Sequence, residues 1–532
     1  MNGYPTWSGM YLAVVDGTER GKMRALALVV LTVAFALSAH GQITGTRNPS
    51  TKVTGGCSSP SPYPCLRTDL GEQQPPSAPN VGGLIGAGSK ACDQTLLLVP
   101  CGGPVGRILR ITDARTDPRR PNVMYDVDNG GSSENQHAGL DGATGGTILL
   151  AVGADGGWGP YLFAFNPATF TATRLYRTAT NSPTVCETGL GTYAAHGGFY
   201  LAGCPYAFSR SNPNWLYVLA DGKHLYKYDF TVQTGQAPTP SLVVDLSLHP
   251  KCTPGATRWT ELSVSENDSA FVWSSAWQQD SAVSWVEVWK PGSGCRQLAL
   301  SSTAHGVVTG EWGPEGEWGS TAQGTLHNSR LALDGRHVVV TMNGTRLPIP
   351  QVWDSAALTV AAPTIGWGHR ASGYEHLSQF PQDAYPKPYA GIYSLATAAL
   401  TALQLDRDHL PAGFVFPDAH PSWMNADPGD TLPVSYIFQQ QGGAITSAWI
   451  NEITEIAADG SQTVWRGVHT FNSGTASGIF SLLYSIHTAF PDGRYIMWES
   501  DWMGSIGCST GASSANCAAS NRRGDVFLVQ LG

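Results

Sequence analysis

The residues best suited to chemistry in this sequence are histidines and carboxylates that stand just before short apolar runs. They are His137, His327, His420 and His487, together with Glu261 and His376. Neutral imidazole and carboxylate oxygen are good ligands for zinc, manganese or iron. If the runs that follow are equivalent strands around one axis, these side chains converge. The pattern predicts a divalent-metal site, and histidines hydrogen-bonded inside the fold are the alternative.

Two carboxylates near the C-terminus form a second candidate site. Glu499 and Asp501 are two positions apart in an expected strand, so both side chains leave the same face. Like charges at this spacing raise the pKa of one carboxyl group, as a general acid requires, and paired carboxylates are the catalytic set of glycosidases. The pair therefore predicts a glycosidase site, with a solvated strand end as the alternative.

Tryptophans accompany these candidates and offer flat apolar faces. They are Trp312, Trp318, Trp423 and Trp502. The first two alternate with Glu311, Glu315 and Glu317 in a glycine-rich stretch, GEWGPEGEWGST. Aromatic rings in an exposed loop stack on sugar rings, so we expect a ligand-binding role. Packing of the same rings between strands is the alternative.

Several other kinds of site are excluded. The sequence has no phosphate-binding loop and no dinucleotide fingerprint. Its formal net charge is −9 and its basic residues form no run, which argues against a nucleic-acid partner. The ligands left to consider are a small molecule, a carbohydrate or a protein, and the only cofactor suggested is a divalent metal.

The elements that must position these residues are hairpins. Residues 486–502 read IHTAFPDGRYIMWESDW, and Asp492-Gly493 separates two apolar runs. Asp-Gly at such a place is a strong hairpin signal, because glycine accepts positive φ and aspartate tolerates it. Residues 326–344 repeat the pattern around Asp334-Gly335. Charged residues are only 13% of the chain while Gly (62) and Pro (35) are plentiful, which favours many short strands joined by turns.

Aromatic-rich outer hairpins recur between these inner ones, for example YLFAFNPATFTATRLY from Tyr161 and WVEVWKPGSGCRQLAL from Trp285. Their spacing of about 40 to 70 residues matches one four-stranded sheet per unit. Such sheets bury both faces only by stacking around an axis, so the sequence predicts an all-β fold, a β-propeller. We expect seven blades, six or eight being possible, with an N-terminal strand completing the last. An array of β-sandwiches is the alternative.

The inner hairpins resemble the repeats of TolB-like and WD40-like propellers, in which a Ser-Pro-Asp-Gly type of turn joins the two inner strands. The matching residues are 490–496, FPDGRYI, and less well 333–338, LDGRHV. The histidine pattern is also similar to the oligogalacturonate lyase branch of these propellers. That resemblance implies a metal, held by His327, His420 and His487, that acidifies a sugar-acid substrate. No residue here matches the lyase's remaining ligand or its catalytic base.

The N-terminal region indicates export. A basic start is followed by fifteen mostly apolar residues from Ala25 to Ala39, too few for a membrane span of about 20 residues. We predict a signal peptide over residues 23–41, with an uncleaved N-terminal anchor as the alternative. Residues 1–22 are then an extension that results from a start codon assigned too early. Residues 42–88, rich in Pro, Ser and Gly, predict a disordered or extended arm, and 89–532 the propeller. The mature protein is then secreted or periplasmic, without membrane insertion, and monomeric.

Ten cysteines support the same compartment. Along the sequence they fall into five pairs of successive cysteines: Cys57 with Cys65, Cys92 with Cys101, Cys186 with Cys204, Cys252 with Cys295, and Cys508 with Cys517. None has the CxxC spacing of zinc or redox sites, so local disulfides in an oxidising compartment are expected.

The sequence favours a propeller that binds a ligand or partner protein through its loop-rich face, with no catalysis identifiable. The alternative is a carbohydrate-active enzyme, a metal-dependent lyase or a glycosidase, with its site at the mouth of the central channel. A scaffold for envelope assembly, suggested by the TolB-like turn alone, is a third hypothesis.

Overall fold

The computed structural model divides the chain into two compact units, Met1–Gly45 and Thr46–Gly532. It describes only residues of the second unit, and no helix among them has the length and apolar character needed to cross a bilayer. The described residues are 84–85, 107–113, 116, 125–127, 136–154, 158–175, 205–220, 224–232, 238–251, 259–275, 283–301, 305–319, 325–343, 348–361, 369–379, 390–405, 410, 414, 418–439, 449–473, 486–508 and 523–531.

The described strands form seven antiparallel sheets, the blades of a propeller. Blade 1 holds β3 (Tyr125–Asp126), β4 (Ile148–Ala154), β5 (Trp158–Asn166) and β6 (Thr171–Arg174). Blade 2 holds β7 (Tyr206–Phe208), β8 (Trp215–Ala220), β9 (His224–Asp229) and β10 (Ser241–Asp245), followed by the 3-10 helix η1 (Leu246–Leu248). Blade 3 holds β11 (Trp259–Val264), β12 (Phe271–Ser275), β13 (Val283–Lys290), β14 (Gly294–Ser301), β15 (Val307–Gly310) and β16 (Gly316–Glu317).

The remaining blades follow in chain order. Blade 4 holds β17 (Thr325–Leu331), β18 (His337–Asn343), β19 (Pro348–Asp354) and β20 (Val360–Ala361). Blade 5 holds β21 (Arg370–Ser372), β22 (His376–Gln379), β23 (Ala390–Ser394) and β24 (Leu400–Leu405). Blade 6 holds β25 (Asp418–Ser422), β26 (Val434–Gln439), β27 (Glu452–Ile456) and β28 (Val464–His469). Blade 7 holds β29 (His487–Ala489) and β30 (Tyr495–Ser500), the 3-10 helix η3 (Trp502–Gly504), and β31 (Asp525–Gln530), with β2 (Ile108–Arg110) and β1 (Leu84–Ile85) from the N-terminal side.

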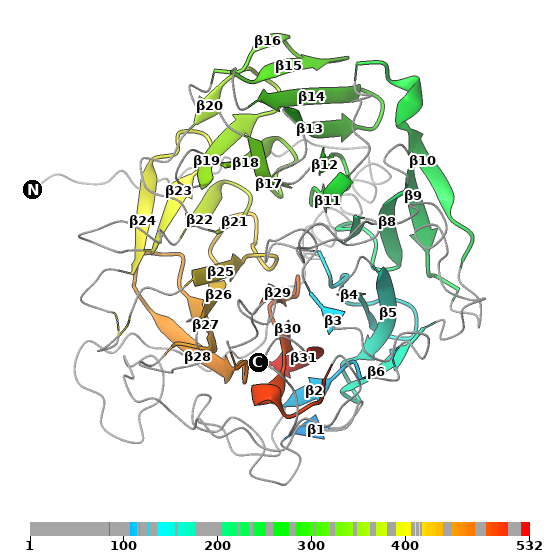
Figure 1. Ribbon diagram of the computed structural model, residues 1–532, viewed down its shortest axis with the longest axis vertical. Helices are drawn as coiled ribbons and strands as arrows, with labels where there is room; N and C mark the ends of the chain where they lie inside the picture. The colour runs from blue at the N-terminus through cyan, green and yellow to red at the C-terminus, as the bar shows by residue number, and fades with distance from the viewer. Residues whose placement is uncertain are drawn as a thin grey trace, which may run out of the picture. The chain divides into compact units, whose positions relative to one another are not determined.

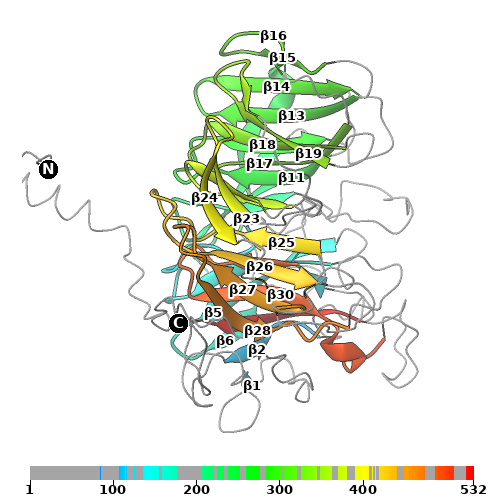
Figure 2. The ribbon, with the colours of Figure 1, turned by 90° about the vertical axis from the view of Figure 1, so that its left-hand side faces the viewer.

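The sheets follow one another around a ring (Figure 1), and the side view shows strands such as β13 and β26 running between the two faces of the ring (Figure 2). The predicted all-β propeller is confirmed, and its blade number is seven. Ring closure is also as expected, because β2 pairs antiparallel with β31, Ile108 opposite Val529. β1 adds two residues of the predicted arm to this sheet.

The hairpin at 486–502 is the inner half of the closing blade. β29 and β30 pair with His487 opposite Trp498, and Gly493 at the turn has φ 66°. The Asp492 carboxylate accepts a hydrogen bond from the Arg494 backbone N–H at 2.9 Å. The Asp334-Gly335 turn between β17 and β18 has the same character, with φ 70° at the glycine. Both inner hairpins predicted from Asp-Gly are confirmed.

The hydrophobic core lies between neighbouring blades. Between blades 6 and 7, for example, Ile437 and Ile453 pack with Trp498 and Phe527, all fully buried. Burying a side chain of this size stabilises a fold by about 1.5 to 3 kcal/mol relative to exposure. Because each blade buries both faces this way, the ring orders the inner strands around its axis.

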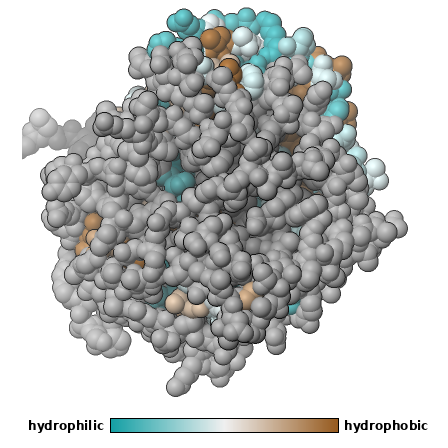
Figure 3. Space-filling model, in the orientation of Figure 1, coloured by the Kyte–Doolittle hydropathy of each residue, from teal (hydrophilic) through white to brown (hydrophobic). Residues whose placement is uncertain are grey.

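Blade 3 differs from the others by its two extra outer strands. β15 pairs with β14 and β16 with β15, so this sheet has six strands. Hydrophilic and apolar residues lie side by side on the described surface of this region, at the top of the space-filling view (Figure 3). Cys295 on β14 and Cys508 after η3 are buried and neither is a free thiol. Their predicted partners, like the other six cysteines, lie outside the described residues, so the pairing stays a prediction.

Candidate functional site

The two faces of the ring are distinguished by what connects the strands. The turn face carries the links between the first and second strands of the blades, from the short turn 490–494 in blade 7 to the longer link 423–433 in blade 6. The opposite face, here the loop face, carries the links between second and third strands and between blades. Most of the loop-face links lie outside the described residues. The first strands of the blades are innermost (Figure 1).

Five of the six predicted metal candidates lie on these innermost segments. His137 precedes the bridge between Ala138 and Leu150 of β4. The other four occupy first strands: Glu261 on β11, His327 on β17, His420 on β25 and His487 on β29. The side chains of Glu261 and His327 are outside what the structure describes.

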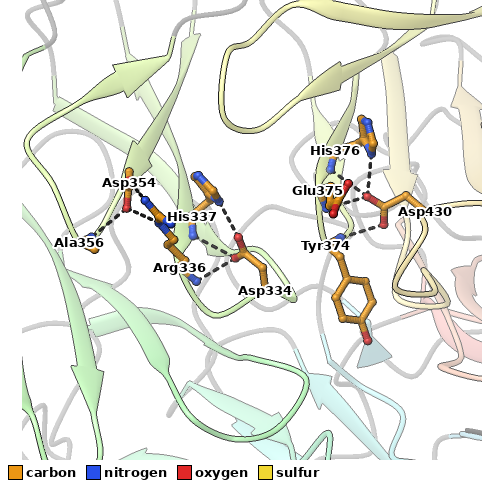
Figure 4. A network of polar contacts seen from close by, with 9 residues as sticks. All are labelled: Asp334, Arg336, His337, Asp354, Ala356, Tyr374, Glu375, His376 and Asp430. Carbon is orange, nitrogen blue, oxygen red and sulfur yellow. Dashed lines mark hydrogen bonds and ion pairs between the residues drawn. The ribbon is translucent and has the colours of Figure 1, made fainter. Parts of the chain in front are cut away.

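His376 is the sixth candidate and lies elsewhere, at the start of the second strand β22. Its Nδ1 is 3.0 Å from Oδ2 of Asp430, and this oxygen also accepts the backbone N–H groups of Glu375 and His376 at 2.8 Å. The other oxygen accepts the N–H of Tyr374 at 2.8 Å. Figure 4 shows Asp430 facing this turn from blade 6 while the Tyr374 phenol points away from it. His376 thus belongs to a clasp between blades 5 and 6.

His137 is completely buried at the interface of blades 1 and 2. Its Nδ1 is 3.0 Å from the Ala151 carbonyl oxygen and 2.8 Å from the hydroxyl of Tyr206. Burial, with a smaller contribution from the positive charge of Arg330 on β17, lowers the pKa of His137 to about 3. The imidazole is therefore neutral at physiological pH. Its Nε2 has no hydrogen-bond partner within the described part of the chain.

His487 has a similar environment between blades 6 and 7. Its Nε2 is 2.8 Å from the Ser435 hydroxyl oxygen of β26. Burial lowers the pKa of His487 to about 3, so this ring is also neutral. No described residue hydrogen-bonds to its Nδ1.

His420 contacts a histidine that sequence reasoning missed. The ring of His369, just before β21 of blade 5, has its centroid 4.1 Å from that of His420 on β25. His369 directly precedes the inner strand β21, whereas His487 is the first residue of β29. The sequence signal for this segment is weak, because β21 is only three residues long and lacks an Asp-Gly turn.

These histidines do not assemble into a metal centre within the described structure. No group of three or more His, Cys, Asp or Glu side chains among the described residues is placed to hold one ion. The His369–His420 pair brings two imidazoles together, while His137 and His487 bond to separate neighbours.

Glu499 and Asp501 are fully buried near the loop face, so a solvated strand end is the wrong interpretation. Asp501 accepts the backbone N–H of Ser473 at 2.8 Å and its hydroxyl at 2.5 Å. This contact joins η3 of blade 7 to the end of blade 6. Asp501 therefore has a structural role, and its catalytic role stays a prediction.

The four tryptophans are packed to different degrees. Trp318, Trp423 and Trp502 are at most 2% exposed. Trp502 stacks on Phe527 at 4.4 Å between ring centroids. Trp312 is half-buried, with the Lys290 ammonium 4.5 Å from its ring centroid. Packing of the rings between strands, the alternative to ligand binding, accounts for the three buried tryptophans.

Comparison with known proteins adds little beyond the fold. No family model and no curated protein matches the chain. Among solved structures, an oligogalacturonate lyase from Vibrio parahaemolyticus is 8% identical with a TM-score of 0.43, covering 80% of this chain and 93% of the lyase. The structure of U3-55K is 10% identical with a TM-score of 0.30, and the match covers 61% of this chain and 94% of the U3-55K chain. The tricorn protease is 9% identical with a TM-score of 0.29, and the match covers 63% of this chain and 31% of the protease chain. The seven-bladed fold rests on the strand pairing.

Proposed function

We propose that this protein is an exported β-propeller that binds a polar ligand, a carbohydrate being the class that fits best, at the inner strands below its loop face. The observation that carries the proposal is the pair of buried neutral imidazoles, His137 and His487. Each keeps one ring nitrogen without a partner among the described residues. Buried polar atoms are normally satisfied by protein, ordered water or ligand.

The hydrogen-bonding capacity of these nitrogens suits hydroxyl groups. The Ala151 carbonyl can only accept, so His137 carries its proton on Nδ1 when it bonds there, and Nε2 then presents a lone pair. An unsatisfied buried group of this kind costs about 1 to 3 kcal/mol. A ligand hydroxyl that hydrogen-bonds to Nε2 removes this cost, and the bond fixes the orientation of the ligand.

A carbohydrate-active enzyme is the second candidate, favoured by the contact of His369 with His420 and by the burial of Glu499 and Asp501. Two imidazoles from neighbouring blades supply part of a divalent-metal site, and buried carboxylates supply acid–base chemistry. A lyase or glycosidase reaction at the channel mouth would use these groups. Metal content of the purified protein, measured by elemental analysis, bears on this candidate.

The decisive experiment is calorimetric titration with a panel of neutral and acidic oligosaccharides. We expect at least one to bind, and His137→Asn and His487→Asn each to weaken it about tenfold or more, equal to about 1.4 kcal/mol. His305→Asn, at an exposed site, is the matched control and should leave the affinity unchanged.

Two outcomes would overturn the binding proposal: no oligosaccharide binds, or both inner-strand variants bind as tightly as the wild type. The same mixtures, incubated with and without added manganese or zinc, are assayed for unsaturated products and new reducing ends. Product formation that is abolished by Glu499→Gln would establish the enzyme candidate instead.

A further inference from the structure

The turn face contains an ion pair between the neighbouring blades 2 and 3. Arg210 follows β7 in blade 2, and Glu266 follows β11 in blade 3. The guanidinium Nε of Arg210 donates to Oε2 of Glu266 at 2.9 Å, and Nη2 forms an ion pair with the same oxygen at 2.9 Å. The Arg210 side chain is 4% exposed and that of Glu266 31%.

The same guanidinium also bonds to the far side of the ring. Its Nη1 donates to the carbonyl oxygen of Met424 at 3.1 Å, in the turn after β25 of blade 6. Blades 2 and 6 have two blades between them on one side of the ring and three on the other, the largest separation that a ring of seven permits. A single side chain can join them only by lying at the axis.

A tyrosine from blade 5 completes the network. The Tyr374 phenol lies beside both Glu266 and Arg210. Burial, followed by the negative charge of Glu266, raises the pKa of Tyr374, so the phenol stays protonated and is able to donate to this carboxylate. Asp430 holds the Tyr374 turn through the backbone bonds shown in Figure 4.

A second contact skips a blade at the same end. The Gln136 side-chain amide of blade 1 donates from Nε2 to the Val264 carbonyl oxygen of blade 3 at 2.8 Å. Val264 ends β11, two residues before Glu266. Bonds between non-neighbouring blades therefore gather where the inner strands reach the turn face.

We propose that Arg210, Glu266 and Tyr374 form a latch that closes the turn end of the central channel and ties blades 2, 3, 5 and 6 across the axis. The latch holds the inner strands at fixed separation independently of the β2–β31 closure in blade 7. It leaves the loop face as the entrance for a ligand. The latch is built from contacts within the chain and does not depend on any ligand being bound.

Hydrogen exchange measured by mass spectrometry tests the latch. In Arg210→Ala we expect backbone amides in the turns of blades 2, 3, 5 and 6 to exchange about tenfold faster or more, because local opening is less costly without the cross-ring bonds. The matched control is Arg336→Ala, which removes a guanidinium–carboxylate pair with Asp354 on the same face but within blade 4. Its effect should stay in blade 4.

The proposal is overturned if Arg210→Ala accelerates exchange only in the blade 2 turn. Should that variant fail to fold, Tyr374→Phe carries the test, since it removes one hydroxyl. It should accelerate exchange at residues 265–270 of blade 3, two blades away, and an unchanged rate there would also reject the latch. Neither readout involves oligosaccharide binding, so failure of the latch and failure of the proposed function are separate results.

Discussion

Burial keeps His137 and His487 uncharged, and this makes folding sensitive to acid. Their folded-state pKa of about 3 lies below the unfolded value of about 6.5. Between these values the unfolded chain binds more protons, so the free energy of unfolding falls as pH falls through this window. Each histidine contributes a slope of about 1.4 kcal/mol per pH unit.

Replacing His487 by asparagine should therefore reduce the pH dependence of the unfolding free energy by about one such slope. Urea unfolding at several pH values from about 4 to 7 measures it, and the difference between variant and wild type isolates the contribution of this residue. A variant slope equal to that of the wild type would show that His487 is protonated in the folded protein.

Glu287 presents the opposite case, a carboxyl group whose pKa burial raises well above its ordinary value. It lies on β13 with Oε2 accepting the Trp273 indole N–H at 2.6 Å. The folded protein keeps this group protonated where the unfolded chain ionises it, so its contribution to stability falls as pH rises above about 4.5. Glu287→Gln does not titrate. We expect its stability relative to wild type to be greater at pH 7 than at pH 5.

Glu287→Ala is the comparison for this prediction. It leaves the Trp273 indole without its acceptor, which costs about 1 to 3 kcal/mol at either pH. Equal stability differences for Glu287→Gln at both pH values would mean that the carboxyl group is ionised in the folded state.

At the scale of elements, sequence-based prediction succeeded where the signal is local. The Asp492-Gly493 and Asp334-Gly335 turns set hairpin geometry through φ at the glycine, which needs no tertiary context. Ring closure by an N-terminal strand was predictable because the last unit stops after one outer strand. The seven-blade count followed from that pairing.

The outer strands of blade 3 could not be predicted in the same way. The stretch containing Trp312 and Trp318 has no strand periodicity, yet Gly316 and Glu317 form β16. Trp318 is buried against Gly306, where an added Cβ would lie 2.9 Å from the indole ring. Gly306 and Trp318 approach this closely only because β14 and β15 pair as outer strands of blade 3. The sequence around Trp312 and Trp318 alone therefore indicates a glycine-rich loop.

The closing strand β2 makes a prediction at this scale. The buried carboxylate of Asp525 on β31 accepts hydrogen bonds from Arg110 and Thr112 of the N-terminal segment and from Arg523. Asp525→Ala leaves the buried guanidinium group of Arg523 and the partly buried one of Arg110 without this carboxylate. We expect a loss of about 3 to 5 kcal/mol in the free energy of unfolding, the cost of breaking a buried ion pair.

Guanidinium chloride unfolding measures this loss, and Gln530→Ala supplies the control. Gln530 on β31 accepts from Arg107, just before β2, at 2.6 Å but is only partly buried, so its removal should cost less than about 1 kcal/mol. Similar losses for both variants would show that the closure depends on the strand ladder and not on Asp525.

At the scale of the whole molecule, the candidate site depends on how the blades meet. The sequence placed five of six candidates on innermost segments, because each precedes an apolar run. It could not supply their partners, since Tyr206 reaches His137 and Ser435 reaches His487 from neighbouring blades. The Arg210 latch draws on four blades and has no signature in sequence spacing. Convergence of this kind follows only from the closed ring.

Export is the remaining prediction for the molecule as a whole, and it concerns covalent structure. If the signal peptide is cleaved near Gly41 in an oxidising compartment, the mature chain begins near residue 42 with its cysteines paired locally. N-terminal sequencing and non-reducing peptide mapping should then recover the bridge from Cys295 to Cys252 and that from Cys508 to Cys517. Replacing Cys252 and Cys295 together by alanine should lower stability by about 2 to 4 kcal/mol, because the bridge restricts the unfolded chain. A mature chain that retains residues 23–41, or peptides joining Cys295 to a distant cysteine, would contradict this account.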